Sequence, residues 1–473
     1  GGANSAADTG YDVDNSCRWN EADKPRLYKS NGTPTSRRKF TYSVWLKRSS
    51  LDEESDLHMI FNINGNSNRF YVAFFGDKLR VNGTKSGDGT TALDIKTNRI
   101  FRDFSAWYHI CVAVDTEQGT AANRIKIYVN GTLETSFANA SYPDEDEDLA
   151  VNESNVEIGN HIDYDNQHYD GYMAEVVFID GTQEAVTSFG EFDEDSPTIF
   201  KPIDVSGLTF GTNGFYLDFE ASDNLGNDAN GGTDFTEDGI AAVDQATDTP
   251  TNSFCVMNPL DNFYAASTFS EGNCKIVTGG SEYSSNKGTM GVSSGKWYFE
   301  VEYDARSGSE DLLHVGISSA QDTASTQGLG YHASDWGRST YSNRAYGYFN
   351  NNSWTNFGTA STPNAIIGCY VDLDNLKLYW AVDGTIENSG TGLDITAPAS
   401  TPFGFYLPAI SWNDGSTYGT LLCNFGGCSS FTVSSAVQDD NGYGNFEYSP
   451  NITGDSEAKK FYALCTKNLA EYG

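Results

Sequence analysis

The sequence has no long apolar run and few positive charges. No apolar stretch in its 473 residues approaches the length of a membrane span, and no signal peptide is visible at its start. Only 29 Lys and Arg stand against 65 Asp and Glu, a formal net charge of −36. Such a surface repels nucleic acid and anionic lipid, so we expect neither as a main partner and no membrane insertion. If the protein leaves a cell, we expect another route, such as assembly into a released particle.

Cysteine pairs with metal-binding spacing are also missing. The eight cysteines form no Cys-x-x-Cys pair and no Cys/His cluster. Cys111 and Cys369 lie within apolar strand patterns, where a free thiol packs as a small hydrophobic group. We therefore expect buried free cysteines, with one or more disulfides as the alternative.

Helical periodicity is almost absent from the chain. Apolar residues alternate with a period of two, as in Phe40–Leu46, Phe70–Phe74 and Ile125–Val129. The aromatic share of 13% and the 48 glycines suit short strands joined by many turns. The sequence predicts an all-β protein, with one short helix around Phe461–Tyr472.

A long hairpin is predicted in the first half of the chain. Trp107–Asp115 and Arg124–Val129 each carry one alternating apolar stripe. Asn130-Gly131 then forms a strong turn signal, because both residues tolerate a positive φ. Two facing stripes joined by a loop make an antiparallel hairpin with one buried side.

The segment from Ala106 to Gly131 resembles the signature hairpin of laminin-G-like domains of the concanavalin A-like lectin type. Tyr42–Lys47 resembles the early strand of that family, and Gly171–Gly181 resembles the late one. The resemblance covers about residues 10 to 215. It implies a jelly-roll sandwich of two antiparallel sheets, a fold that often binds glycans and sometimes calcium.

Asp163, Asp165 and Asn166 are candidate metal ligands in this block. Their carboxylate and amide oxygens suit calcium, although no spacing matches an EF-hand loop and a solvated loop is the alternative. We expect no required cofactor, with calcium as an optional ligand. His161 and His168 are expected at the surface rather than on zinc, since no third ligand is evident.

Five segments of the second half resemble, in their order, the strands of a SPRY domain over about residues 265 to 430. The resemblance implies a sandwich module that binds protein partners through loops on one rim and is not an enzyme. The segments are Gly295–Tyr303, His314–Ser318, Ile366–Gly384, Phe403–Ile410 and Leu422–Gly426.

Asp372, Asp374 and Asn375 lie in the middle of these segments and raise the alternatives of a calcium loop or a turn. A calcium loop would need a Gly and a distant Glu in register, and neither is present. A two-residue turn at Asp374-Asn375 places every apolar pair of the flanking strands on one side, from Leu373 opposite Leu376 outward. The sequence therefore predicts a tight hairpin here.

Aromatic and polar side chains before this hairpin are the predicted ligand-binding residues. Flat rings beside guanidinium and amide groups suit sugar stacking or protein contact. The alternative is that Trp354 packs over the edge of the sandwich. The predicted set is Trp336, Arg338, Tyr341, Arg344 and Trp354.

A glycanase is the catalytic alternative. Glu300 and Glu302 lie two apart on one strand and so share a face, as the paired carboxylates of concanavalin-fold enzymes do. The third acidic residue of the usual Glu-x-Asp-x-x-Glu pattern is missing, however. We predict no catalytic residues and no enzyme activity.

The predicted architecture is two concanavalin A-like antiparallel β-sandwich (jelly-roll) domains in tandem. A polar, turn-rich stretch separates the two blocks. The predicted boundaries are residues 1–215 for a laminin-G-like sandwich, 216–255 for a polar connector, 256–435 for a SPRY-like sandwich and 436–473 for a C-terminal extension.

Across nearly its whole length, the chain also resembles surface proteins of marine bacteriophages. This resemblance implies a non-enzymatic virion surface protein, a tail-fibre or capsid-decoration subunit at an extracellular location. Its expected partners are other virion subunits, including copies of itself, and a glycan or protein of the host surface. A secreted bacterial lectin or adhesin is the alternative.

Overall fold

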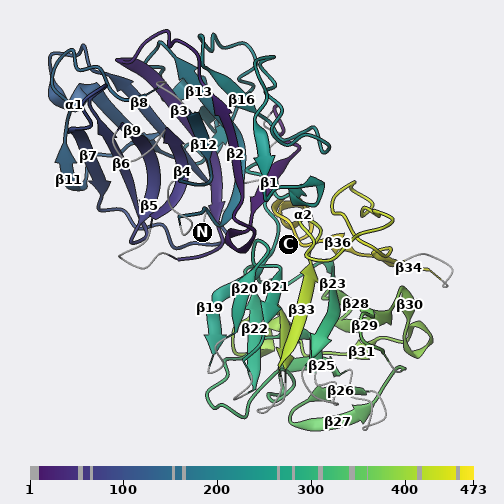
Figure 1. Ribbon diagram of the computed structural model, residues 1–473. Helices are drawn as coiled ribbons and strands as arrows, with labels where there is room; N and C mark the ends of the chain where they lie inside the picture. Colours follow the sequence, from purple (N-terminus) through teal and green to yellow (C-terminus); the bar gives the residue numbers. More distant parts are fainter. Residues whose placement is uncertain are drawn as a thin grey trace. The chain divides into compact units, whose positions relative to one another are not determined.

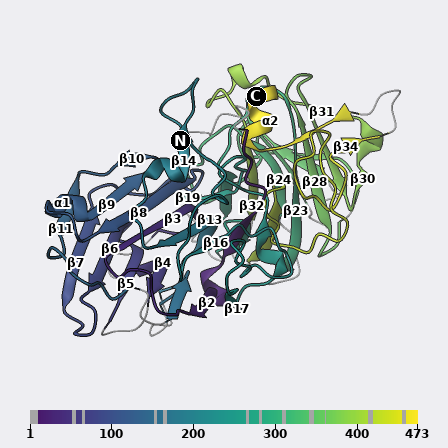
Figure 2. The ribbon, with the colours of Figure 1, turned by 90° about the horizontal axis from the view of Figure 1, so that it is seen from above.

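The alternating apolar pattern folds into four large, mainly antiparallel sheets, paired as two β-sandwiches. The structure is a computed structural model (Figures 1 and 2). It describes residues 10–51, 57–63, 68–151, 155–161, 167–263, 267–279, 283–306, 313–339, 347–359, 361–412, 418–453 and 459–473. The chain divides into two units, Gly1–Asn252 and Ser253–Gly473. A search of the described helices finds none with the length and apolar character that a membrane span requires.

The first unit contains two large sheets. Sheet 1 has the strand order β10-β9-β8-β3-β13-β1-β18, with β16 also pairing with β13. Its strands are β1 (Ser16–Trp19), β3 (Lys39–Arg48), β8 (Tyr108–Asp115), β9 (Ile125–Val129), β10 (Thr132–Leu133), β13 (Gly171–Asp180), β16 (Phe215–Leu217) and β18 (Gln245–Ala246). The short helix α1 (Ala121–Arg124) joins β8 to β9, and β14 (Gly190–Phe192) pairs with β15 (Phe200–Pro202).

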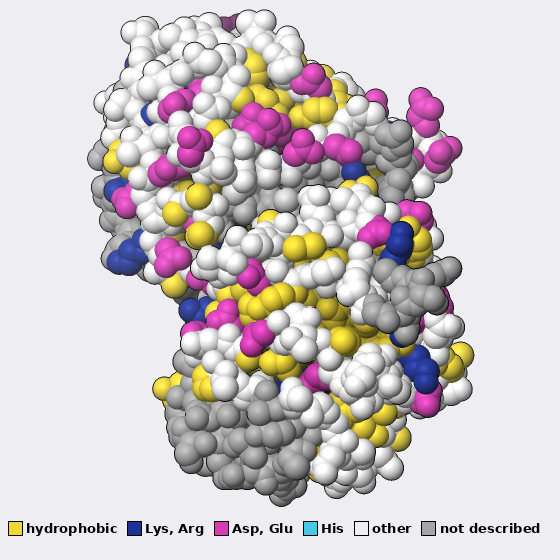
Figure 3. All heavy atoms as spheres, turned by 90° about the vertical axis from the view of Figure 1, so that its right-hand side faces the viewer, with side chains coloured by type: hydrophobic (Ala, Val, Ile, Leu, Met, Phe, Trp, Pro, Cys, Tyr) yellow, Lys and Arg dark blue, Asp and Glu magenta, His cyan; other side chains and the backbone are white. Residues whose placement is uncertain are grey.

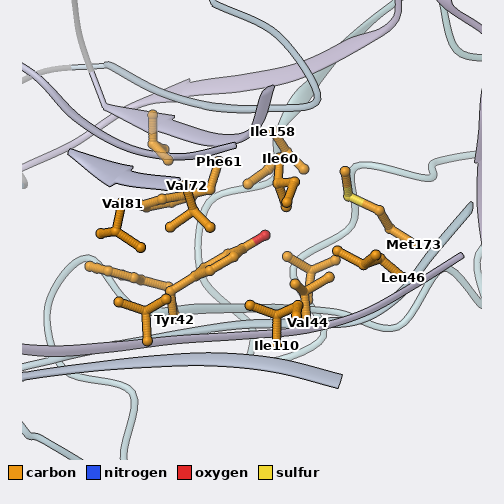
Figure 4. Packing of buried hydrophobic residues seen from close by; sticks show 14 of the residues in the cluster. Tyr42, Val44, Leu46, Ile60, Phe61, Val72, Val81, Ile110, Ile158 and Met173 are labelled. Atoms are coloured by element: carbon orange, nitrogen blue, oxygen red, sulfur yellow. The ribbon is translucent and has the colours of Figure 1, made fainter. Parts of the chain in front are cut away.

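Sheet 2 completes the first sandwich, with the order β11-β7-β6-β5-β4-β12-β2-β17. Its strands are β2 (Arg26–Ser30), β4 (Leu57–Ile63), β5 (Phe70–Phe75), β6 (Lys78–Thr84), β7 (Thr91–Thr97), β11 (Phe137–Ser141), β12 (Asn155–Ile158) and β17 (Thr236–Asp238). The inner faces of the two sheets form one core. Figure 4 shows Tyr42 and Val44 of β3 facing Phe61 of β4 and Val72 of β5.

The predicted hairpin of the first block is confirmed. Ile110 of β8 lies opposite Val129 of β9, and Val114 lies opposite Ile125. All four side chains belong to the core. Two-sheet burial of this kind leaves the other face of each strand free for polar residues.

The second unit repeats the plan with sheets 3 and 4. Sheet 3 has the order β19-β22-β32-β24-β25-β26-β27, and sheet 4 has the order β20-β21-β33-β23-β28-β29-β30, with β31 and β36 attached. Sheet 3 contains β19 (Met257–Phe263), β22 (Ser284–Gly288), β24 (Leu313–Ser318), β25 (Asp335–Ser339), β26 (Gly347–Asn350), β27 (Ser353–Asn356) and β32 (Leu407–Trp412). Sheet 4 contains β20 (Thr268–Ser270), β21 (Lys275–Val277), β23 (Lys296–Arg306), β28 (Ile366–Asp372), β29 (Lys377–Val382), β30 (Thr385–Ile386), β31 (Leu393–Asp394), β33 (Gly419–Asn424) and β36 (Tyr462–Ala463).

The end of the chain packs on sheet 4. It includes β34 (Asn451–Ile452), β35 (Lys459–Lys460) and the helix α2 (Thr466–Tyr472), where the sequence predicts a helix. The rings of Phe446 and Phe461 pack against Tyr298 and Tyr370 on the outer face of this sheet. The described residues 436–453 and 459–473 therefore form an integral layer of the second unit, which differs from the predicted extension.

The predicted connector also has a different role. Its strands β16, β17 and β18 pair with β13, β2 and β1, so most of residues 216–255 belong to the first unit. A buried ion pair holds its end: Asp248 accepts hydrogen bonds from Lys47 Nζ at 2.7 Å and Trp107 Nε1 at 2.9 Å. Short strands and the buried, ion-paired carboxylates of Asp228, Asp244 and Asp248 anchor a segment that is polar in composition.

The hairpin at Asp372 has the predicted register but a longer turn. Val371 lies opposite Leu378, whereas the last pair is Asp372 with Lys377. The positive φ of 54° falls on Leu376 and not on the predicted Asp-Asn pair. The Asp372 carboxylate accepts hydrogen bonds from the backbone and side-chain nitrogens of Asn375 at 3.0 and 2.9 Å. This side-chain cap stabilises the wider turn, and the carboxylate is a turn former as expected.

The cysteine prediction is confirmed, because all eight cysteines are buried thiols outside any disulfide bond. Burial raises the pKa of the Cys369 thiol well above its usual value. These thiols therefore act as packing groups.

Replacing Asp248 by Ala should destabilise the first unit by about 3 kcal/mol or more, because it removes the carboxylate that compensates the buried Lys47 ammonium. Denaturant unfolding followed by tryptophan fluorescence measures the loss. Asp238→Ala is the matched control, since its ion pair with Arg26 is partly exposed and should contribute less than about 1 kcal/mol. Equal small losses in both variants would show that the buried pair is not an anchor.

Candidate functional site

The residues predicted to bind ligands in the second unit are partly buried. The Trp336 ring packs edge-on against Tyr406 in the core at 5.8 Å between ring centres. Arg338 is 1% exposed and forms a bidentate ion pair with Glu387. Its Nε and Nη2 donate hydrogen bonds to the two carboxylate oxygens at 2.8 and 2.9 Å. Neither side chain can reach a ligand at the surface. The prediction treated both as surface groups, because sequence periodicity does not show which loop residues turn inward.

Trp354 is the remaining described member of that set. It lies half-buried on β27, where its Nε1 donates a hydrogen bond to Asn356 Oδ1 at 3.3 Å. Its position on the terminal strand of sheet 3 agrees with the alternative of edge packing. The predicted residues Tyr341 and Arg344 lie outside the described residues.

The predicted calcium ligands cannot be placed. Asp163, Asp165 and Asn166 all lie outside the described residues. Their neighbours His161 and His168 were expected at the surface, but each is only 3% exposed. That expectation was wrong, because backbone hydrogen bonds hold the residues next to them against the sheet: Gln167 O accepts one from Met59 N of β4 at 3.2 Å, and Gly159 O accepts one from Tyr169 N at 2.8 Å.

The paired glutamates of the glycanase alternative do not face a common open surface. Glu300 is fully buried, and its carboxylate accepts hydrogen bonds from Tyr298, Asn424 and the backbone nitrogens of Glu447 and Tyr448. Burial raises its pKa to about 7. Glu302 is half-buried. The Glu300 carboxylate is thus occupied in holding the C-terminal layer on sheet 4.

The strongest described site is on the outer face of sheet 2. The strands β5, β6 and β7 are neighbours in this sheet (Figure 1). Alternation sends Phe70, Val72 and Phe74 into the core, so that Tyr71 and Phe75 face outward. Outward-facing residues of these three strands, together with Arg69 just before β5, form a surface that we call the sheet 2 patch. Its residues are Arg69, Tyr71, Phe75, Lys78, Arg80, Asn82, Asp94 and Lys96.

Positive charge gathers on the sheet 2 patch. Arg80 and Lys96 lie directly opposite each other on β6 and β7, and Lys78 lies two residues before Arg80 on the same face. Like charges at opposed positions repel. Within the described residues, Lys78 and Lys96 form no ion pair, while Arg80 binds Asp94 through two hydrogen bonds of 2.7 and 3.1 Å. The patch therefore holds four cationic side chains and one carboxylate, in a chain whose net charge is −36.

Aromatic rings and an amide complete the patch. The Arg80 guanidinium lies 5.5 Å and the Lys96 ammonium 5.2 Å from the centre of the Phe75 ring. Asn82 accepts a hydrogen bond from Arg69 Nε at 2.9 Å and donates one to the backbone of Leu93. Although burial raises the pKa of Asp94, the hydrogen bonds from Arg80 and its neighbours outweigh that effect and lower it. The carboxylate is therefore ionised at neutral pH, and the patch offers rings, donors and acceptors together.

Asn62 of β4 lies next to the patch, opposite Tyr71. Its side chain is fully buried, and neither its nitrogen nor its oxygen has a hydrogen-bond partner among the described residues. A buried amide without hydrogen bonds lowers the free energy of unfolding by about 1–3 kcal/mol, so we expect a polar group to form a hydrogen bond with it. The cross-strand pairing places this amide beside the Tyr71 ring.

Sequence reasoning missed the sheet 2 patch. The strand Phe70–Phe74 was predicted, but its outward residues carry no motif. Arg80 and Lys96 meet only through the pairing of β6 with β7, and a one-residue slip would separate them. An excess of Lys and Arg at alternate positions between residues 69 and 96 is the one signal that could have indicated the patch.

A second group of titratable residues lies in sheet 1. Glu175 has a positive φ of 50°, at the irregularity in the pairing of β13 with β3. Its buried carboxyl group receives hydrogen bonds from Tyr216 at 2.9 Å and Tyr11 at 3.1 Å. Burial raises the pKa of Glu175 to about 8. The carboxyl is therefore largely neutral at pH 7, and its partners are hydroxyls that can also accept its proton in a hydrogen bond.

A comparison with protein families matches part of the first unit. Residues 26–185 match the family model Laminin_G_3, described as the concanavalin A-like lectin/glucanases superfamily. The first unit therefore contains a laminin-G-like, concanavalin A-like domain, as the sequence predicted. The matched range includes every residue of the sheet 2 patch.

Similarity to individual proteins is limited. A stretch of 130 residues, 27% of the chain, is 29% identical to the ATP-dependent RNA helicase DDX1 of Xenopus laevis, of which it spans 16%. Among solved structures, the SPRY domain of human HERC1 aligns with this chain at 13% identity and a TM-score of 0.29. The alignment covers 37% of this chain and 99% of that domain. A Bacteroides ovatus protein for which carbohydrate binding has been proposed also aligns with this chain, at 17% identity and a TM-score of 0.34. The alignment covers 49% of this chain and 60% of that protein. These likenesses concern the fold and transfer no activity.

Replacing Glu175 by Gln should change how stability depends on pH. Because the folded pKa of about 8 lies above the ordinary 4.5, the neutral carboxyl stabilises the fold fully below pH 4.5 and progressively less up to pH 8. Unfolding free energies at pH 4.5 and 8.5 should therefore differ less in Glu175→Gln than in the unmodified chain, by up to about 4 kcal/mol. Glu191→Gln, at an exposed position, should leave the difference unchanged. An unaltered pH profile in Glu175→Gln would show that this carboxyl is ionised in the fold.

Proposed function

We propose that this protein is a non-enzymatic carbohydrate-binding protein, and that its sheet 2 patch binds an anionic glycan, one carrying carboxylate or sulfate groups. The match of residues 26–185 to concanavalin A-like lectins and glucanases supports carbohydrate as the ligand class. The proposal rests above all on the opposed Arg80–Lys96 pair, whose charges nothing else in the described structure fully balances.

The charge of the patch selects the class of glycan. The chain as a whole repels anions, and acidic side chains are spread over the face shown in Figure 3. Lys78, Arg80 and Lys96 are half-buried, so their charged groups remain accessible at the surface. An acidic sugar would relieve the repulsion between Arg80 and Lys96, and charge-assisted hydrogen bonds of this kind are about twice as strong as neutral ones.

The remaining groups of the patch suit sugar rings. Phe75 offers a half-exposed face for the apolar side of a pyranose, and Asp94 offers acceptors for hydroxyl groups. Asn62 and Asn82 lie on either side of Tyr71 in the same cross-strand row, buried beneath the exposed groups of the patch. A non-catalytic role is supported by the Glu300 carboxylate, which is occupied by four hydrogen bonds. We expect no release of reducing sugar from a panel of polysaccharides.

Replacing both Arg80 and Lys96 by Ala should abolish binding to acidic glycans. We expect the full chain to bind alginate-type or sulfated polysaccharides on a glycan array, and to bind neutral glucans and mannans at least about tenfold more weakly. Binding should weaken with added salt, since the attraction is between charges. Isothermal titration of the preferred oligosaccharide measures the loss in Arg80→Ala/Lys96→Ala, which we expect to exceed about tenfold.

Lys126→Ala provides the control for this test. Lys126 lies half-buried on β9 of sheet 1, so the variant removes one positive charge from the same unit but not from the patch. Its affinity should equal that of the unmodified chain. Equal losses in Lys126→Ala and the double variant would reveal a general charge effect, and absence of binding to every glycan would refute the proposal.

We further propose that the protein works at the surface of a virion, as a fibre or decoration subunit beside other copies of itself, and presents its patch to host glycans. Support comes from the whole-chain resemblance to surface proteins of marine bacteriophages and from the acidic, helix-poor composition. Mass spectrometry of purified particles should detect this polypeptide. Its absence from particles, together with its presence in a bacterial culture medium, would favour a secreted adhesin.

A further inference from the structure

Three side chains of the second unit meet where β24 ends and β25 begins. Asp335 is the first residue of β25 and lies opposite Ser318, the last residue of β24. Asp322 and His332 come from the segment that joins these strands. Their carboxylate oxygens and imidazole nitrogen all lie within 4.8 Å of one another. His332 Nε2 is 3.3 Å from Asp322 Oδ1.

Both carboxylates are buried without a Lys or Arg beside them. Asp322 is 3% and Asp335 2% exposed. Asp335 accepts hydrogen bonds from Ser318 Oγ at 2.8 Å and from the His332 backbone at 3.2 Å. Within the described residues, Asp322 has no hydrogen bond and no partner other than His332, and neither aspartate pairs with Lys or Arg. Burying two carboxylates in this way is costly unless a cation compensates them.

The imidazole nitrogen that faces these carboxylates is also unsatisfied. His332 Nε2 is buried and has no hydrogen bond of acceptable geometry among the described residues. A lone pair aimed at two carboxylates would repel them, whereas a cation between the three groups would accept all of them as ligands. Ligands about 2.0–2.2 Å from a shared ion lie at most about 4.4 Å apart, so separations within 4.8 Å bring the three groups close to coordination distance.

Other buried carboxylates of the chain show the contrast. Asp77 pairs with Arg48 at 3.1 Å, and Glu387 pairs with Arg338 at 2.8 Å, with both partners at most 2% exposed in each pair. Asp248 is compensated by Lys47 in the same way. The fold thus supplies a basic side chain for these buried carboxylates, but only a half-buried imidazole for the pair Asp322–Asp335.

We propose that Asp322, His332 and Asp335 bind a first-row divalent transition-metal ion, Zn²⁺ or Mn²⁺. The imidazole nitrogen favours such ions over Ca²⁺ and Mg²⁺, which take oxygen ligands. Two carboxylates and one neutral imidazole neutralise the double positive charge. Three protein ligands leave at least one coordination position for water or another donor. The bound ion would also fasten the segment between β24 and β25 to the start of β25.

Metal titration of the full chain tests this site. After treatment with a chelator, the protein is titrated with ZnCl₂ or MnCl₂ in the presence of excess Ca²⁺ and salt, which occupy the many exposed carboxylates. We expect one tightly bound ion per chain and a higher melting temperature with the ion than without it. His332→Ala and Asp322→Asn should each weaken the affinity at least about tenfold.

Asp304→Asn is the control, because Asp304 is an exposed carboxylate on β23 of the same unit. The affinity of this variant for the metal ion should equal that of the unmodified chain. Asp322→Asn also provides a check on folding. Without metal it should melt at a higher temperature than the unmodified chain, since it removes one of two neighbouring buried carboxylates. Absence of tight binding, or equal binding in His332→Ala, Asp322→Asn and the unmodified chain, would overturn the proposal. Neither result bears on the glycan proposal, which concerns the first unit.

Discussion

The structure depends on the one-sided burial of its β-sheets. In β5, Phe70, Val72 and Phe74 enter the core, and the period of two then forces Tyr71 and Phe75 to the outer face. The same rule in β6 and β7 sets Arg80 and Lys96 on that face, across from each other. The core therefore determines where the sheet 2 patch lies, and its register determines which charges meet there.

Compensation of buried charge is the second constraint. The pair Lys47–Asp248 holds the end of the first unit, and Arg338–Glu387 stabilises the second. Each pair places a carboxylate beside a basic side chain, because a lone buried charge is very unfavourable. Asp322 and Asp335 depart from this pattern, and the opposed cations of the sheet 2 patch depart from it in the opposite sense. Both proposals concern positions at which the chain leaves charge without a full partner.

Much of the fold was predictable from local patterns. The hairpin of β8 and β9 carries two apolar stripes, and the turn Asn130-Gly131, in which both residues have positive φ, then joins β9 to β10. The register of β28 with β29 follows from matching apolar positions, although the turn is wider because the Asp372 side chain caps it. The site was less predictable: Trp336 and Arg338 look like surface ligands in the sequence, yet one packs in a core and the other neutralises Glu387.

Local periodicity thus determined the all-β class, the position of many of the longer strands and the apolar face of each, because these depend on neighbours two residues apart. Tertiary structure alone decided that residues 216–252 complete the first unit, since their short strands are stable only against β13, β2 and β1. It also decided which charged residues meet. Arg80 and Lys96 are sixteen residues apart and Asp322 and Asp335 thirteen, and only strand pairing and chain reversal bring each set together.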